Sequence, residues 1–246
     1  MEQIFQKTFH IPATAVDCFD RLKPSQILDY LQDVAGDHCM LLGTDRQALT
    51  DWNLFWAVLR HRVQITRLPR AGEDITLQTW PMPTTRTAYP RATAAFDLGG
   101  NLLFRCVSLW VLMDTQKRTM VLPGNSGVEV NGIARGDELT VHGSLALKPL
   151  AHKDDRTVRF TDLDWNGHMN NCRYLDWVAD TLPGSFHEGH SIKEFFVNYL
   201  SEAREGDGVT LHWELSKDGI LAVDGCREED GLSASRGRVF SARVLF

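Results

Sequence analysis

The sequence predicts an α+β protein built from two similar halves. Each half has one amphipathic helix, followed by strand-like runs that turn residues separate. The first helix is expected at 24–42 and the second at roughly 170–182. The expected strands lie at 54–68, 73–80, 85–97 and 102–113 in the first half, and at 191–201, 208–216, 219–226 and 236–246 in the second.

The first helix has clear start and stop signals. Pro24 suits a first turn because its φ angle is already helical and no N–H is needed there. Gly43 ends the helix, since glycine readily adopts the left-handed closing conformation. One face is apolar and carries Ile27, Leu31, Val34, Ala35 and Leu42. Before this helix, the first eleven residues alternate like a strand.

The second helix shows the same kind of pattern, and a repeat is supported by one alignment. Its apolar face carries Leu175, Val178, Ala179 and Leu182, and it stops at Pro183. Residues 63–77 lie over 197–211 at a constant offset, and both read as strand, turn with glycine, strand. The weakly patterned segment between the halves is the expected linker. The predicted organisation is therefore a first domain at 1–130, a linker at 131–152 and a second domain at 153–246.

Composition excludes several classes of protein. The 246 residues can bury one large core or two small ones. The net charge of −6 argues against nucleic acid as a partner. The five cysteines show neither CxxC spacing nor a cluster with histidines, so we expect a reducing compartment and no metal site. No apolar run is long enough to insert across a membrane, and the N-terminus reads as neither signal nor transit peptide. We therefore expect a cytoplasmic protein.

The densest chemical signal is the run from 160 to 175. Asp164, Asn166 and His168 stand at every second residue before the second helix, so an extended segment would point all three to one side. The helix start behind them would offer unpaired N–H groups, which suit a developing oxyanion with a water beside it. The same residue types also crowd turns and helix caps for structural reasons. The residues alone leave both interpretations open.

Differences between the halves indicate where the chemistry lies. Glu202 aligns with Leu68, and the segment 17–23 before the first helix lacks Asp-x-Asn-x-His. Taken alone, Glu202 also fits a solvated hairpin residue. We infer one active centre, in the second half, which leaves the apolar faces of the first half to line a lipid pocket. The candidate substrate-binding residues of that pocket are Leu28, Leu31, Trp52 and Trp56.

Long segments in both halves carry a family resemblance. The second half has a helix-entry motif from Asp162 to Tyr174, and the first half matches at Leu28–Asp33, Arg67–Trp80 and Trp110–Pro123. Over nearly its whole length the chain resembles the acyl-acyl carrier protein thioesterases. The first-half match separates this family from the single-hotdog acyl-CoA thioesterases. The resemblance implies a tandem double hotdog, in which each half is a long helix wrapped by an antiparallel sheet.

The resemblance also implies an activity and a set of site residues. The reaction would be hydrolysis of the thioester between a fatty acyl chain and the phosphopantetheine arm of acyl carrier protein, without a cofactor or metal. Asp164, Asn166 and His168 fall on the family's catalytic triplet, and Glu202 falls on its catalytic glutamate. Plant members carry a cysteine directly after that glutamate, where this chain has Ala203.

The expected mechanism therefore uses water rather than a cysteine. Glu202 would act as general base, with hydrogen bonds from His168 and Asn166, while Asp164 orients those two residues. N–H groups at the start of the 170–182 helix would bind the thioester oxygen. The alternative chemistry is a nucleophilic Cys172 in the first turn of that helix.

Three other functions compete with this one. An acyl-CoA thioesterase of the hotdog type would share the triplet but need no surface for a carrier protein. A hotdog dehydratase would act on a 3-hydroxyacyl thioester with different catalysts. A non-enzymatic acyl-binding module would keep the pocket without needing Glu202. The sequence fixes neither the acyl length nor the oligomeric state, and it leaves a homodimer open.

Overall fold

The computed structural model describes residues 3–141, 143–146, 149–227 and 237–246. These residues fall into two compact units. The first is formed by Met1–Lys23 and Asp29–Val141, and the second by Pro24–Leu28 and His142–Phe246. The change from one unit to the other after Val141 falls inside the segment 131–152 that the sequence assigns to the linker.

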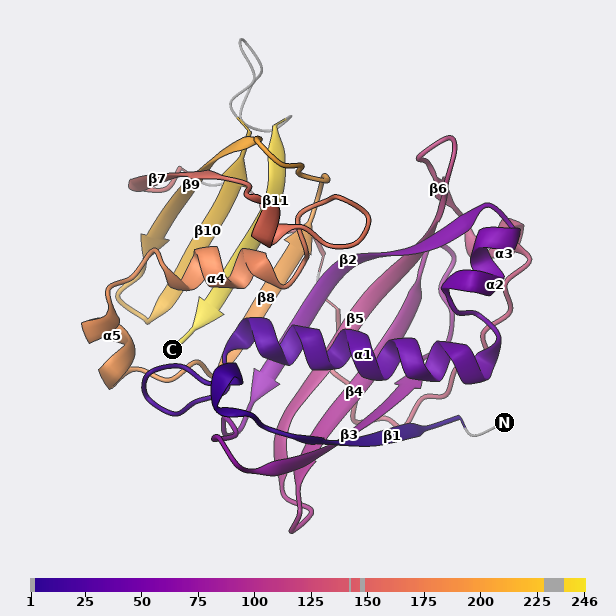
Figure 1. The fold of residues 1–246 in the computed structure, drawn as a ribbon, viewed down its shortest axis with the longest axis horizontal. Coiled ribbons are helices and arrows are strands. Elements are labelled where there is room, and N and C mark those ends of the chain that lie inside the picture. Colours follow the sequence, from indigo (N-terminus) through magenta and orange to yellow (C-terminus); the bar gives the residue numbers. More distant parts are fainter. Residues whose placement is uncertain (1–2, 142, 147–148, 228–236) are drawn as a thin grey trace. The chain divides into compact units, whose positions relative to one another are not determined.

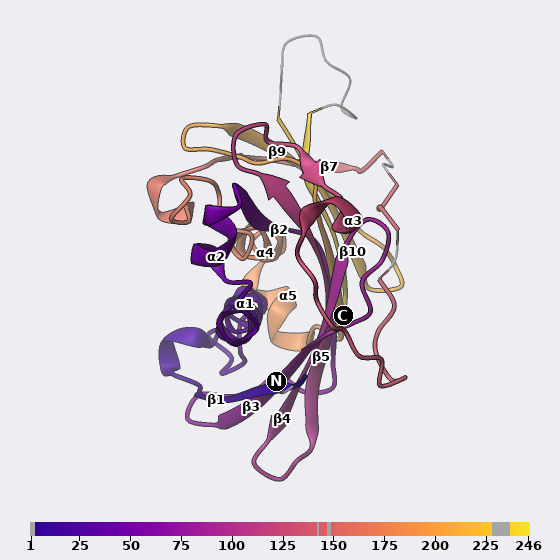
Figure 2. The same ribbon diagram turned by 90° about the vertical axis from the view of Figure 1, so that its right-hand side faces the viewer.

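An antiparallel sheet and a long helix make up most of the first unit. The sheet order is β1-β3-β4-β5-β2, with the short β6 beside β5. The helix α1 lies across one face of this sheet (Figures 1 and 2). The elements are β1 (Phe5–His10), a 3-10 turn (Ala13–Ala15), α1 (Pro24–Leu42), α2 (Arg46–Asp51), β2 (Leu54–Ile65), β3 (Asp74–Pro81), β4 (Tyr89–Asp97), β5 (Leu102–Asp114), β6 (Met120–Val121) and α3 (Pro123–Ser126).

The predicted ends of the first helix are confirmed. Pro24 occupies the first turn of α1, and Gly43 closes it with a φ of 66° while its N–H donates to the Met40 carbonyl. Of the predicted apolar face, Ile27, Leu31, Val34 and Ala35 are buried, whereas Leu42 in the last turn is only partly buried. Strand β4 begins later than predicted. The hydroxyl of Thr85 accepts from the Ala88 N–H and donates to its carbonyl, which closes a turn before the strand.

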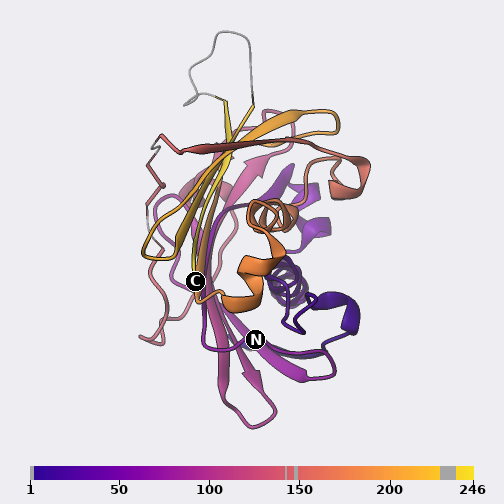
Figure 3. The same cartoon turned by 90° about the vertical axis from the view of Figure 1, so that its left-hand side faces the viewer.

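The second unit repeats this arrangement with a shorter helix. Its antiparallel sheet has the order β7-β9-β10-β11-β8, and α4 lies against one face (Figures 1 and 3). Tyr174 of α4 packs on Phe240 of β11 with ring centroids 4.6 Å apart. The elements are β7 (His152–Thr157), a 3-10 turn (Phe160–Asp162), α4 (Arg173–Ala179), α5 (Gly184–Gly189), β8 (Glu194–Tyr199), β9 (Gly208–Leu215), β10 (Ile220–Cys226) and β11 (Arg238–Leu245).

The single long helix expected at 170–182 is wrong. The side chain of Asn170 accepts from the Cys172 N–H, which holds the chain in a turn before α4 starts at Arg173. After Ala179 the chain turns again, and Pro183 precedes the separate helix α5. The second half therefore has a seven-residue helix where the first has nineteen.

The internal repeat is confirmed by strand order and by backbone hydrogen bonds. With β1 matched to β7 and β2 to β8, both sheets have the same order. The N–H of Ile11 donates to the Glu73 carbonyl at 2.8 Å, and the N–H of Val158 donates to the Asp207 carbonyl at 3.0 Å. The two acceptors, Glu73 and Asp207, have the offset of the alignment of 63–77 with 197–211, and the two donors occupy equivalent places after β1 and β7. The sequence repeat is thus a repeat of structure.

Candidate active site

A tight turn presents the predicted triplet. Leu163 and Met169 pair as an isolated antiparallel bridge, and the chain reverses between them. The Asp164 carboxylate accepts from the N–H of Asn166 at 2.8 Å and from that of His168 at 3.2 Å. The expectation of an extended segment is therefore wrong. The every-second-residue spacing instead lets one carboxylate hold the backbone of the other two residues.

The loop after β8 brings Glu202 to this turn. The N–H of Met169 donates to the Ala203 carbonyl at 2.8 Å, so the turn and the loop lie side by side. His168 Nε2 lies 3.2 Å from Glu202 Oε2. The Glu202 side chain is 45% exposed and the His168 side chain 16%. A carboxylate that contacts an imidazole and remains open to solvent is suited to take a proton from water.

Asn166 and Tyr174 flank this pair. Asn166 is exposed, and its side-chain amide donates to Asp164 Oδ2 at 3.3 Å. Tyr174 is buried, and burial raises the pKa of its phenol well above the usual value. Arg227 lowers this pKa, whereas the carboxylates of Asp207, Glu202 and Asp164 raise it further. The phenol therefore stays neutral near three carboxylates. The sequence motif contains Tyr174, but sequence reasoning gave it no role at the site.

Three of the N–H groups at the start of α4 are already hydrogen-bonded within the protein. The N–H of Asn170 donates to the Asp162 carbonyl at 2.8 Å, and the N–H of Arg173 donates to the Asn170 carbonyl at 2.9 Å. The N–H of Cys172 is taken by the Asn170 side chain at 2.9 Å. These three donors already have acceptors within the protein, so the prediction that they bind the thioester oxygen is wrong for them.

The position after Glu202 and the cysteine of the motif are both buried. Ala203 has no exposed surface, and neither does Cys172. A nucleophile must reach the substrate carbonyl, and a fully buried thiol cannot do so without a local rearrangement. The geometry therefore favours packing as the role of Cys172.

The first half contains the same turn without the same chemistry. Val16 and Leu22 form the equivalent bridge, and the Asp17 carboxylate accepts from the N–H groups of Phe19 at 2.9 Å and Arg21 at 3.0 Å. Phe19 and Arg21 thus occupy the positions of Asn166 and His168, and the residue equivalent to Glu202 is Leu68. The turn geometry is present in both halves, whereas the amide, the imidazole and the glutamate belong to the second half only.

The predicted pocket residues of the first half lie in different surroundings. Leu28 and Leu31 are buried in α1. Trp56 packs edge-on against Tyr89 with ring centroids 4.9 Å apart, and its indole donates to the Thr44 carbonyl at 2.9 Å. Trp52 follows α2 and is 53% exposed. The expectation that Trp52 is an inward-facing wall is therefore wrong.

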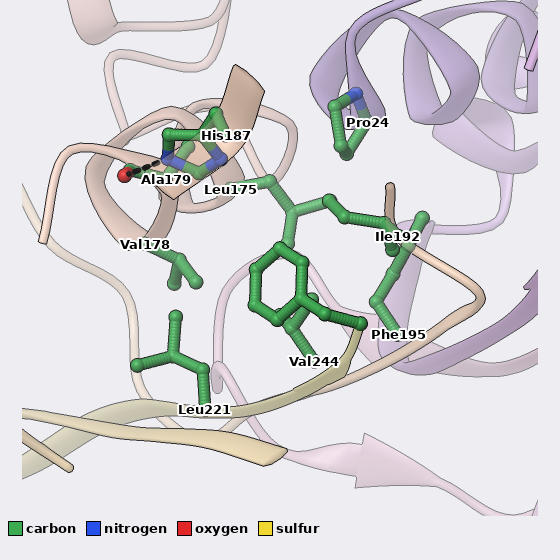
Figure 4. A pocket seen from close by; sticks show the side chains of 10 residues that line it. Pro24, Leu175, Val178, Ala179, His187, Ile192, Phe195, Leu221 and Val244 are labelled. Carbon is green, nitrogen blue, oxygen red and sulfur yellow. Dashed lines mark hydrogen bonds between the residues drawn. The ribbon is translucent and has the colours of Figure 1, made fainter. Parts of the chain in front are cut away.

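An apolar pocket lies in the second unit, beside α4 and α5. Figure 4 shows Leu175, Val178, Leu221 and Val244 around it, with His187 at its edge. The cavity is small, about 10 Å³, which is the space of about one water molecule. His187 Nε2 lies 3.0 Å from the Ala179 carbonyl. Leu175 and Val178, which the sequence predicts on an apolar helix face, also line this space.

Two features are absent from the part of the chain that the structure describes. There, histidine, cysteine and acidic side chains form no group of three or more that would hold a metal ion. Over the same residues, every helix is too short or too polar to cross a bilayer.

A helix laid across an antiparallel sheet, present twice, together with an acid–imidazole pair in the second copy, defines a double-hotdog protein with one candidate active site. Comparison with known proteins identifies the family. Residues 2–122 match the acyl-ACP thioesterase N-terminal domain, and residues 149–236 match the acyl-ACP thioesterase C-terminal domain. The chain belongs to the acyl-ACP thioesterase family, and the expected family and tandem hotdog fold are confirmed.

Curated relatives come from plants. A chloroplastic dodecanoyl-[acyl-carrier-protein] hydrolase of Cinnamomum camphora is 28% identical over 215 residues, covering 81% of this chain and 56% of the relative. A chloroplastic palmitoyl-acyl carrier protein thioesterase of Arabidopsis thaliana is 25% identical over 260 residues, covering 98% of this chain and 60% of the relative. The chain thus spans little more than half the length of these relatives.

Solved structures of similar fold cover the whole chain. An acyl-ACP thioesterase from Bacteroides thetaiotaomicron has a TM-score of 0.84 and 23% identity, covering 99% of this chain and 98% of that one. The 12:0-ACP thioesterase from Umbellularia californica has a TM-score of 0.82 and 25% identity, covering 100% of this chain and 97% of that one.

Proposed function

We propose that this chain hydrolyses fatty acyl-acyl carrier protein thioesters, releasing a free fatty acid and the carrier thiol. Family membership supports the substrate class. The observation that carries the chemistry is the 3.2 Å approach of His168 Nε2 to Glu202 Oε2 beside the turn of the motif. The alternative is an acyl-CoA thioesterase of the hotdog type, which would use the same residues on a different thiol.

In the proposed reaction, Glu202 removes a proton from a water molecule as its oxygen attacks the thioester carbonyl carbon. The tetrahedral intermediate collapses, the C–S bond breaks and the leaving thiolate takes up the proton. His168 holds the Glu202 carboxylate, and Asn166 helps to hold the water. Asp164 acts through the backbone, because its carboxylate accepts the N–H groups of both residues. The buried Ala203 and Cys172 support a water nucleophile over a thiol.

The assay offers a series of acyl-carrier protein and acyl-CoA substrates and follows both free thiol and free fatty acid. Equal release of the two from the carrier substrates is the expected result. Preference for CoA would favour the alternative, whereas loss of water from a 3-hydroxyacyl substrate would identify a dehydratase. Binding without release would identify an acyl-binding module.

The assignment of Glu202 is tested by Glu202→Gln in the same assay. Removing the general base while keeping the shape of the side chain should lower kcat by about 10²–10⁴-fold. Thermal unfolding should change little, because the side chain is nearly half exposed. Activity close to that of the parent protein would reject Glu202 as the base.

A further inference from the structure

Arg227 follows the end of strand β10 and reaches across to the loop that carries Glu202. Its Nη2 donates to the Ser201 hydroxyl at 3.3 Å and to the backbone carbonyl of Glu202. Its Nε lies 3.5 Å from Asp207 Oδ2, and the same carboxylate oxygen accepts from the Arg204 N–H at 3.0 Å. One guanidinium therefore links the two ends of the loop 201–207. Charge-assisted contacts of this kind are stronger than neutral hydrogen bonds.

We call this link between the two ends of the loop, made by one guanidinium, the latch. The first half contains an equivalent latch, but its guanidinium comes from a different position in the chain. Arg67 aligns with Ser201, and its Nη1 donates to the backbone carbonyl of Leu68 at 3.4 Å, the position equivalent to Glu202. It also pairs with Glu73, the equivalent of Asp207, through two hydrogen bonds of 2.8 Å. In both halves a guanidinium thus contacts the same carbonyl and the same acid. In the first half it comes from the loop itself, and in the second from Arg227, the residue that follows strand β10.

The difference matters because only the second loop carries a reacting group. A cation at position 201 would place a long charged side chain directly beside the Glu202 carboxylate in sequence. With Ser201 there, the guanidinium approaches from β10 and holds the main chain of Glu202, while the Glu202 side chain reaches His168. Pairing with Asp207 gives the Arg227 charge a carboxylate partner of its own.

We propose that Arg227 is a positioning residue that fixes the backbone of Glu202 so that its carboxylate stays beside His168. The inference rests on the proposed role of Glu202 as general base. A small displacement of a catalytic group can lower a rate by about two orders of magnitude. Arg227→Gln should therefore lower kcat by about 10- to 100-fold, with KM changed less than threefold and the pH profile of kcat unchanged in shape.

The position of Arg67 in the first half suggests a double variant that should restore the activity lost in Arg227→Gln. In the double variant Ser201→Arg with Arg227→Gln, the guanidinium returns to the position that Arg67 occupies, and it can again contact the carbonyl of residue 202 and Asp207. This variant should recover at least half of the lost kcat on a logarithmic scale. Arg204→Gln is the matched control, because it removes an exposed arginine from the same loop and should keep kcat within twofold of the parent.

A second double variant shows whether Arg227 acts through Glu202. If it does, Arg227→Gln with Glu202→Gln should be no slower than Glu202→Gln alone, since the group being positioned is already absent. Arg227→Lys, which keeps the charge but not the forked donors, is measured beside it. Folding of every variant is followed by circular dichroism.

Several results would overturn the proposal. These are a folded Arg227→Gln variant with kcat within twofold of the parent, multiplicative losses in the double variant with Glu202→Gln, and failure of the relocated arginine to restore kcat. Loss of folding in both Arg227→Gln and Arg227→Lys would also overturn it, since the latch would then be purely structural. An active Glu202→Gln enzyme would instead reject the base itself, so the two failures are distinguishable.

Discussion

At the scale of single residues, Asp164 and Cys172 gain roles that the motif alone does not assign. Asp17 holds the equivalent turn in the first half, where no imidazole, amide or glutamate accompanies it. Turn formation is therefore part of what Asp164 does. Cys172 lies buried at the start of α4, where its side chain packs out of reach of an incoming thioester.

Cys172→Ala should consequently keep kcat within about threefold of the parent, because a buried thiol contributes packing rather than chemistry. The expected cost is a modest loss of stability, about 1 kcal/mol, as for a typical small change in a core. The measurements are steady-state turnover on an acyl-carrier substrate and urea unfolding. A folded but inactive variant, or an acyl group trapped on Cys172 in the parent protein, would contradict the water mechanism.

At the scale of elements, the turn before each helix is defined by its backbone. Gly167 has a φ of 75°, and Asp20 stands at the equivalent position in the first half with a φ of 59°. Glycine tolerates this left-handed conformation without strain, and aspartate and asparagine tolerate it better than other residues. A Cβ atom built on Gly167 would meet nothing within 4 Å, so the cost of adding that atom is backbone strain rather than a steric clash.

Gly167→Val should therefore weaken the turn, since a left-handed conformation costs an ordinary side chain about 1–2 kcal/mol. Lower stability and a larger loss of kcat are expected together, because the strain falls between Asn166 and His168. Gly167→Asn is the matched variant and should lose much less of both. Urea unfolding and kcat are measured for the pair, and equal behaviour of the two variants would refute the role of the turn conformation.

At the scale of the whole molecule, we infer a division of labour between the halves. The proposed catalytic pair, His168 and Glu202, lies in the second half, and the proposed acyl pocket lies in the first, where Leu28 and Leu31 are buried in α1. The apolar pocket beside α4 gives the second half a competing candidate. The two candidates predict different effects on the chain-length profile.

Leu31→Ala should shift the preferred acyl chain toward longer substrates if the wall lies in the first half. Each additional buried CH₂ contributes about 0.8 kcal/mol, roughly a fourfold change in selectivity per carbon. Val178→Ala is the matched variant, because Val178 is a buried helix residue that lines the second-half pocket. Profiles of kcat/KM against chain length are compared for both. A shift of the chain-length profile with Val178→Ala alone would show that the acyl pocket lies in the second half.

Glu202 and His168, which the structure brings together, were assigned to the site through the family resemblance. The sequence by itself determined the repeat, the long first helix and most strands. These features are local in origin, because helix signals, strand alternation and turn glycines act over a few residues, and the constant offset between 63–77 and 197–211 carries the repeat. Asp164 and Asn166 were identified by their spacing and by the resemblance, whereas the turn conformation that joins them was not predicted.

Only the tertiary structure decided the short α4, the occupied N–H groups at its start and the latch formed by Arg227. Each depends on contacts between segments distant in sequence or on competition between hydrogen-bond acceptors, which no local pattern records. Arg227 lies 25 residues beyond Glu202 and belongs to no motif. The physical reason is that a side chain is positioned by whatever the fold packs against it, and the fold places β10 beside the loop of β8 and β9.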